Sequence, residues 1–359
     1  PHVLAHHWQA ADRPERESLY VQQAAQYFLR IDDRPQAKTW ALRAVELIEY
    51  TPTHAVQAHL LAGRALRRLS EYDAARQHYE AALSLNPTPA QVAEAQIGLG
   101  EVAVAAEDYA TGRQQLQAAL AALPQTPKNR KLRARATYQL GSAYMLQGHY
   151  ADALPHFEQC LGDYDALNDD AGIAKTARQV GICAFYQGQY AVAQGHYETS
   201  LTHAQRAGDL GARSAALRNL GIIAYRQGDY AAALDYYEQA LTLEKRFGTS
   251  FGVAAVLVNM AVTLENSGDY DEARTQYIEA RDRFAAINHR MGMATCDLNL
   301  SSISERLGDI EAAFAYAEAS LTLREAANDI TGQISSHRKL ASLHFDQGDL
   351  NAATQHYDK

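Results

Sequence analysis

Side chains suited to hydrogen-bonding a peptide recur in this sequence every forty residues. An Asn or Gln side chain carries both a donor and an acceptor, so it can pair with a backbone amide whatever the peptide's sequence. Arginines precede some of these positions and offer charged donors to carboxylates. The candidate binding residues are Gln139, Gln179, Asn219, Asn259 and Asn299, together with Arg178, Arg218 and Arg338. The alternative is a row of solvated polar residues without a ligand.

The histidines do not have the spacing of a catalytic or metal site. Four of the 14 share one position of the forty-residue pattern, His78, His156, His196 and His356. Helices in successive repeats pack about 8–10 Å apart, too far for one zinc ion with ligands at about 2 Å. His2 and His6 are four residues apart, but no third ligand accompanies them. With no catalytic motif either, we expect no catalytic residue, metal or cofactor.

The composition indicates a folded chain with a large core. Of its 359 residues 47% are apolar and 21% are charged, whereas disordered chains are poorer in apolar residues. The net charge of −9 argues against a nucleic-acid-binding face, which needs basic residues. No apolar run is long enough to span a membrane. The three cysteines lack paired spacing, which predicts a cytoplasmic protein without disulfides.

A repeat supplies the elements that position the amides. The stretch GDYAAALDYYEQAL, which begins at Gly228, has near copies that begin at Gly188 and Gly268. Small and aromatic residues at offsets of three, four and seven lie on one face of a helix. Glycine ends one helix, and the aspartate after it caps the next. Each unit is therefore predicted to be a helix A, a short turn and a helix B, with neighbouring units stacked.

The far end of each unit carries a second signal. The recurring residues are Asn168, Gly208, Gly248, Asn288 and Asn328. Asn and Gly tolerate the left-handed conformation that ends many helices. Four of the five following residues are good N-cap types, and His289 is the exception. Helices of roughly 15–17 residues are predicted between these signals.

These columns resemble the tetratricopeptide repeat. The residues that carry the resemblance are Leu220, Gly221, Tyr225, Gly228, Asp229, Tyr230, Ala233, Tyr237 and Ala240. The resemblance implies an all-α, right-handed superhelical solenoid, with about eight repeats over residues 56–359, the last incomplete, and capping or opening helices in residues 1–55. It also implies that the amide column faces a concave groove, lined by the A helices, that binds a protein or peptide. The forty-residue period is similar to that of Rap-type regulators and kinesin light chains.

The first 55 residues resemble the junction where such arrays begin in bacterial STAND-class signal-transduction ATPases and MalT-like regulators. We therefore expect a fragment of a longer signalling protein, and its ligand-sensing part. The alternative is an allosteric sensor of a small molecule or a short signalling peptide. Neither nucleic acid nor membrane is an expected partner, and an end-to-end dimer through the last helix is a further possibility.

Overall fold

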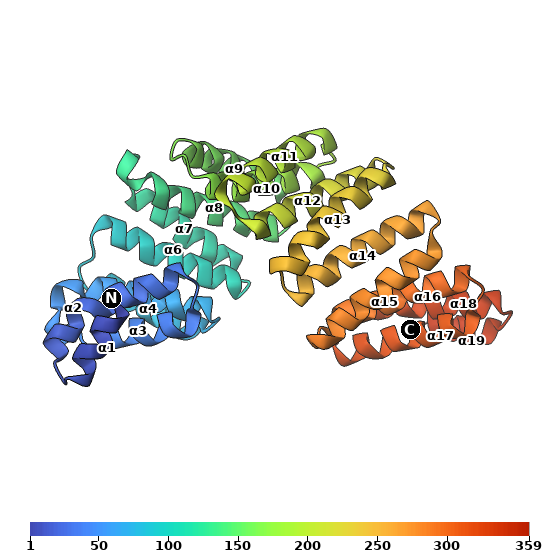
Figure 1. Cartoon of the computed structure of the whole chain (residues 1–359), viewed down its shortest axis with the longest axis horizontal. Coiled ribbons are helices and arrows are strands. Elements are labelled where there is room, and N and C mark those ends of the chain that lie inside the picture. The colour runs from blue at the N-terminus through green and yellow to red at the C-terminus, as the bar shows by residue number, and fades with distance from the viewer. Residues whose placement is uncertain (359) are drawn as a thin grey trace. The chain divides into compact units, whose positions relative to one another are not determined.

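The computed structural model describes residues 1–358, which form helices joined by short connections without a strand. The chain consists of two compact units, with the boundary between Gln189 and Tyr190 (Figure 1). The first contains α1 (His2–Ala10), α2 (Pro14–Arg30), α3 (Arg34–Glu46), η1 (Ile48–Tyr50), η2 (Pro52–His54), α4 (Ala55–Arg68), α5 (Tyr72–Ser84), α6 (Pro89–Ala105), α7 (Tyr109–Ala122), η3 (Pro127–Asn129), α8 (Arg130–Leu146), α9 (Tyr150–Asp165) and α10 (Asp170–Tyr186). The second contains α11 (Tyr190–Ala207), α12 (Leu210–Arg226), α13 (Tyr230–Phe247), α14 (Ser250–Ser267), α15 (Tyr270–Ala286), α16 (Arg290–Arg306), α17 (Ile310–Ala326), α18 (Ile330–Asp346) and α19 (Leu350–Tyr357). The predicted all-α repeat of paired helices is confirmed.

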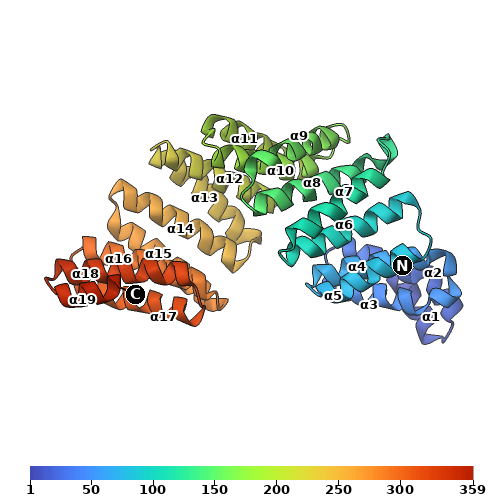
Figure 2. The same ribbon diagram turned by 180° about the vertical axis from the view of Figure 1, so that it is seen from behind.

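Each glycine–aspartate turn joins the two helices of one repeat, as predicted. Gly228 has φ of 81°, a left-handed conformation that costs glycine little. The Asp229 carboxylate then accepts a hydrogen bond of 3.0 Å from the backbone nitrogen of Ala232 and caps α13. Figures 1 and 2 show the paired helices that such turns produce.

The connections between repeats have the predicted left-handed residue with one exception. Asn168, Asn288 and Asn328 have φ of 50°, 54° and 53°. The prediction for Gly248 was wrong, because its backbone is extended, with φ of −86° and ψ of −179°. The Glu244 side chain lies against this glycine, in the space that a side chain on it would need. His289, not predicted as a cap, accepts a 3.0 Å hydrogen bond at Nδ1 from the Gly292 nitrogen.

Aromatic rings on the B helices fill the space left by small residues on the A helices. The Tyr237 ring covers Gly221, and a methyl group on this glycine would collide with it. Two repeats later, Ala317 occupies the position of this ring and Ser301 occupies the position of the glycine. The Ser301 hydroxyl donates a 2.7 Å hydrogen bond to the backbone oxygen of Ala313, so the two helices pack closely without the ring.

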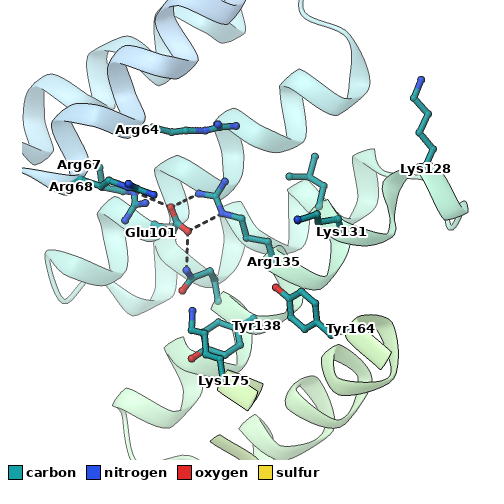
Figure 3. Close-up of a pocket in the computed structure, with 12 residues that line it drawn as sticks. Arg64, Arg67, Arg68, Glu101, Lys128, Lys131, Arg135, Tyr138, Tyr164 and Lys175 are labelled. Atoms are coloured by element: carbon teal, nitrogen blue, oxygen red, sulfur yellow. Dashed lines mark hydrogen bonds and ion pairs between the residues drawn. The ribbon is translucent and has the colours of Figure 1, made fainter. Parts of the chain in front are cut away.

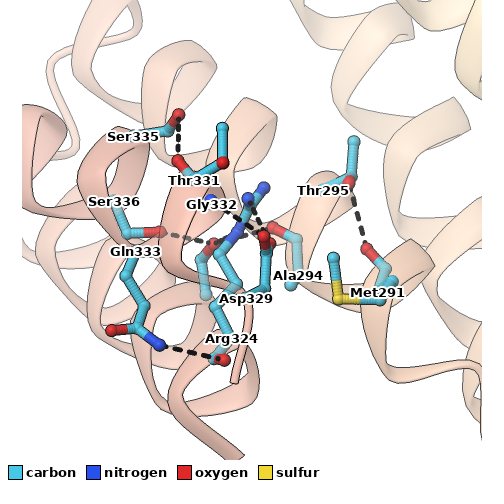
Figure 4. Close-up of polar contacts among 11 residues, drawn as sticks. Met291, Ala294, Thr295, Arg324, Asp329, Thr331, Gly332, Gln333, Ser335 and Ser336 are labelled. Atoms are coloured by element: carbon cyan, nitrogen blue, oxygen red, sulfur yellow. Dashed lines mark hydrogen bonds and ion pairs between the residues drawn. The ribbon is translucent and has the colours of Figure 1, made fainter. Parts of the chain in front are cut away.

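A second set of small residues lets each repeat pack on the next repeat. A large side chain in the last turn of a B helix covers a glycine eight residues later. The pairs are Tyr164–Gly172, Glu244–Gly252, Phe284–Gly292 and Arg324–Gly332. In the last pair the buried Arg324 also contacts Asp329 at 3.2 Å and Ser320 at 3.3 Å (Figure 4). The packing between neighbouring repeats therefore uses the same pair of positions each time, although the large side chain differs from repeat to repeat.

The A helices of the first unit form its inner layer. Helix α4 packs against α6, and α6 packs against α8, in addition to the contacts that each makes with its B helix. Side chains from three successive repeats therefore share one surface. Over the described residues, none of the helices combines the length and the apolar character that crossing a bilayer requires.

Candidate functional site

The inner surface of the first unit contains a cavity of about 640 Å³. Most of its wall comes from α4, α6, α8 and α10, with one residue each from η3 and α9 (Figure 3). Its lining residues are Arg64, Arg67, Arg68, Glu101, Lys128, Lys131, Leu132, Arg135, Tyr138, Gln139, Tyr164 and Lys175. Seven of these are basic and one is acidic. The cavity therefore has the size of a small-ligand pocket and a strongly positive wall.

Glu101 organises the centre of this cavity. Its carboxylate accepts hydrogen bonds of 3.2 and 2.7 Å from Nε and Nη2 of Arg135, and another of 2.8 Å from Gln139. An ion pair of 3.0 Å joins it to Arg67. Burial by itself would raise the pKa of Glu101, but the arginine charges and these hydrogen bonds outweigh it and lower the pKa. The carboxylate therefore holds side chains of three A helices in place as an anion.

The other two arginines of the wall pair with carboxylates that do not line the cavity. Arg64 pairs with Glu94, and Arg68 pairs with Asp32 at 3.0 Å. The same Arg68 donates a 2.6 Å hydrogen bond to the backbone oxygen of Leu29. These contacts hold the α4 side of the wall.

The lysines lie on the side of the cavity formed by η3, α8 and α10. Lys131 reaches Asp169 only at 4.0 Å, and Lys175 has its ammonium 3.8 Å from the ring centroid of Tyr138. Lys128 and Lys175 form no ion pair within the part of the chain that the structure describes. All three are exposed. This side of the wall is positive and open to a ligand.

The predicted amides of the first unit already have protein partners. Gln139 lies in the cavity and donates to Glu101. Gln179 is 7% exposed and donates a 2.8 Å hydrogen bond to the hydroxyl of Tyr138, while its buried Oε1 has no partner among the described residues. Arg178 is half-buried on α10. These amides are thus partly occupied in holding the inner surface together.

The remaining candidates belong to the second unit. Asn219, Asn259 and Asn299 are half-buried on α12, α14 and α16. The buried Nδ2 of Asn219 has no partner within residues 1–358. Arg218 is half-buried beside it, and Arg338 is exposed on α18. Their role in binding stays a prediction.

The basic cavity was not predicted from the sequence, because the negative net charge of the whole chain conceals a local cluster of cations. The signal lay beside the amide column. Arg135 and Lys175 occupy one position of the forty-residue pattern, four residues before Gln139 and Gln179. Arg64 and Glu101 share another, each one residue after the small glycine of helix A. Comparing the charge of each column would have located this wall.

The histidines and cysteines have structural surroundings. His59 and His78 contact each other through their Nδ1 atoms at 2.9 Å, and the pair His337 and His356 repeats this at 3.0 Å. Over the described residues, no three His, Cys, Asp or Glu side chains gather as they would around a metal ion. Cys160, Cys183 and Cys296 are free and buried.

Comparison with known proteins identifies the repeats. A family model described as "Tetratricopeptide repeat" matches residues 91–166, 172–246 and 252–326. A second model with the same description matches residues 56–89. No curated protein matches the sequence.

Several solved structures share the fold at low sequence identity. The apo form of the quorum sensor NprR from B. thuringiensis has a TM-score of 0.70 and 17% identity, over 94% of this chain and 96% of that one. A STAND protein with a tetratricopeptide repeat sensor from Pyrococcus horikoshii has a TM-score of 0.67 and 17% identity, over 89% of this chain and 52% of that one. A Rap protein complexed with Competence and Sporulation Factor has a TM-score of 0.58 and 13% identity, over 94% and 99%.

Proposed function

We infer that this chain, which belongs to the tetratricopeptide repeat family, is a binding scaffold rather than an enzyme, and that a protein or peptide ligand occupies its inner surface. The cavity of the first unit carries this proposal, because side chains of successive A helices converge there around a space of about 640 Å³. A rigid repeat array can hold such a surface in one shape, since each unit is fixed by its neighbours. The fold alone does not determine function, so the proposal rests on the residues of the site.

Two amide groups on A helices, one in each compact unit, carry a hydrogen-bonding atom that the protein does not use. The Oε1 of Gln179 and the Nδ2 of Asn219 are buried and without a partner over the described residues. Leaving such groups unpaired costs about 1–3 kcal/mol each, a cost that a ligand's backbone would remove. The predicted amides and arginines of each unit would add contacts of the same kind, with the arginines selecting carboxylates.

A sensing role inside a larger cytoplasmic signalling protein fits this chemistry. The Pyrococcus horikoshii protein named above is a STAND protein whose sensor is a tetratricopeptide repeat region, and the alignment covers 52% of it. We propose that ligand binding to this chain likewise biases a switch located elsewhere. A ligand can do so only if it binds the two states of the switch with different affinity.

A second candidate is a sensor of a small molecule or a short signalling peptide. The cavity volume favours it, since pockets for small ligands measure about 300–1,000 Å³. The Rap structure above is a complex with Competence and Sporulation Factor, which is a property of that protein. Compaction of the chain on ligand addition, measured by small-angle scattering, would support this candidate.

Site-specific photo-cross-linking tests the scaffold proposal. A cross-linking amino acid is placed at Leu132, an uncharged residue of the cavity wall, and, as a matched control, at Glu158, which is exposed on the B helix α9. Both variants are irradiated in lysate of the source cell, and the adducts are identified by mass spectrometry. A protein or peptide captured from position 132 but not from position 158 is the expected result. Capture only from Glu158 would place binding on the outer face and contradict the proposal.

A further inference from the structure

We propose that the cavity of the first unit binds a compact polyanion, meaning a ligand that places two or more phosphate or carboxylate groups within a few ångströms of each other. This inference rests on the proposed function, because it takes the inner surface as the binding surface. It goes further by naming the chemistry of the ligand. The ligand's charged groups would face lysines and arginines from three A helices at once.

The charge of the wall is the first argument. Seven basic residues and one acidic residue line the cavity, in a chain whose net charge is −9. A positive wall of this kind, in a negatively charged protein, is a local feature and not an effect of composition. Like charges held together in a partly enclosed space raise the local potential and attract anions.

The way the cations are held is the second argument. Glu101 is shared between two arginines, Arg67 and Arg135, so it cannot neutralise both. Its bonds keep the Arg135 guanidinium fixed, and a guanidinium has five donors, of which Arg135 uses two on this carboxylate. A fixed guanidinium with free donors is suited to phosphate or carboxylate, because little entropy is lost on binding.

The lysines supply the third argument. Lys128, Lys131 and Lys175 are exposed around the other side of the cavity, and Lys175 is oriented by the ring of Tyr138 at 3.8 Å. Desolvation by the surrounding protein is the main effect on the pKa of Lys175 and lowers it; the charge of Glu101 acts in the opposite direction, and Arg178 and Arg135 lower the pKa by smaller amounts. A bound anion would stabilise the charged form of Lys175. Cations on both sides of the cavity therefore favour a ligand with more than one negative group.

The size of the cavity limits the ligand. A volume of about 640 Å³ admits a phosphorylated small molecule or a few acidic residues of a peptide, but not a folded domain. Both sources present the same chemistry to the wall. The experiment below distinguishes them.

Calorimetric titration of the whole chain tests the proposal with three probes, namely inorganic tripolyphosphate, a capped tetraglutamate peptide and a capped tetraglutamine peptide. The test variant carries Lys131→Gln and Lys175→Gln, two exposed residues of the cavity. The control carries Arg206→Gln and Arg290→Gln, exposed residues of the second unit with the same total charge change. Circular dichroism verifies that all three proteins are equally helical.

The expected result is that at least one anionic probe binds, more weakly at higher salt, and that the test variant raises its Kd by about tenfold or more. The control variant should stay within about twofold, and tetraglutamine should not bind. Binding of tripolyphosphate alone would identify a phosphorylated small molecule, and binding of tetraglutamate alone an acidic peptide. Absence of binding by both anions, or equal loss in both variants, would overturn the inference.

The two proposals fail separately. A partner that still cross-links from position 132 when neither anion binds would leave the scaffold function standing and refute only the polyanion. Anion binding without any cross-linked protein would support a small-molecule sensor instead.

Discussion

Glu101 and Arg135, on the adjacent A helices α6 and α8 and 34 residues apart, form a two-point contact with distances of 3.2 and 2.7 Å. The same carboxylate also holds Arg67 and Gln139 (Figure 3). The contact therefore joins three repeats at the base of the cavity. Its geometry fixes a guanidinium where a ligand can reach it.

Glu101→Gln should destabilise the chain by roughly 2–3 kcal/mol at neutral pH, because the buried arginines lose their shared anion. The pKa of Glu101 is lowered in the folded state, so its stabilisation is fully present above the unfolded pKa of about 4.3 and is lost as the pH falls through the lower folded value. Urea denaturation at several pH values should therefore show the difference between the two proteins closing in acid. Exposed Glu158→Gln is the control and should change little. A gap that stays constant down to strongly acidic pH would contradict this account.

Arg281 and Asp297 form an ion pair between α15 and α16, and Asp297 is fully buried. Arg281→Leu should cost about 3–5 kcal/mol, because it leaves a buried carboxylate without its counter-charge. The double replacement of both residues by leucine should recover most of this loss. The reason is that the equivalent pair in the previous repeat is Leu241 and Leu257. Thermal unfolding of the single and double variants measures the coupling, and a double variant as unstable as the single one would disprove it.

The ring of Tyr164 occupies the space that a side chain on Gly172 would need. Gly172→Ala should therefore destabilise the chain by about 1–3 kcal/mol and displace Tyr164 from the cavity wall. Gly162 lies in the neighbouring helix α9 with open space around it. Gly162→Ala should instead stabilise by about 0.5–1 kcal/mol, because it removes backbone freedom from the unfolded chain. Denaturation midpoints of the two variants should move in opposite directions, and a shift of both in the same direction would refute the packing argument.

Burial raises the pKa of Cys160 and Cys296 to about 12 and that of Cys183 to about 11. In the folded protein these thiols should not react with an aromatic disulfide reagent at pH 8, whereas three should react after unfolding. Because the folded pKa values lie above the unfolded value of about 8.5, the associated stability is present below that pH and is lost as the pH rises toward the folded values. Rapid modification of any thiol in the folded state would show that its burial is incomplete.

Local features were predictable because they depend on residues close in sequence. The positive φ of Gly228 and the cap from Asp229 follow from a turn of a few residues, and both were predicted. The extended backbone of Gly248 was not predicted, since the bulky Glu244 side chain that lies against it is specific to that repeat. The Tyr164–Gly172 pairing joins two columns eight residues apart, and only the packing of successive repeats shows that these columns meet.

The sequence by itself determined the paired helices, their ends and the faces they bury, because repetition and hydrogen bonds between near neighbours encode all three. The tertiary structure decided which side chains remain available to a ligand. Gln139 and Gln179 belong to the same column as Asn219, yet the first two donate to Glu101 and Tyr138. These partners lie 38 and 41 residues away. The charge of the cavity was decided in the same way, because its cations come from different repeats and only packing brings them to one wall.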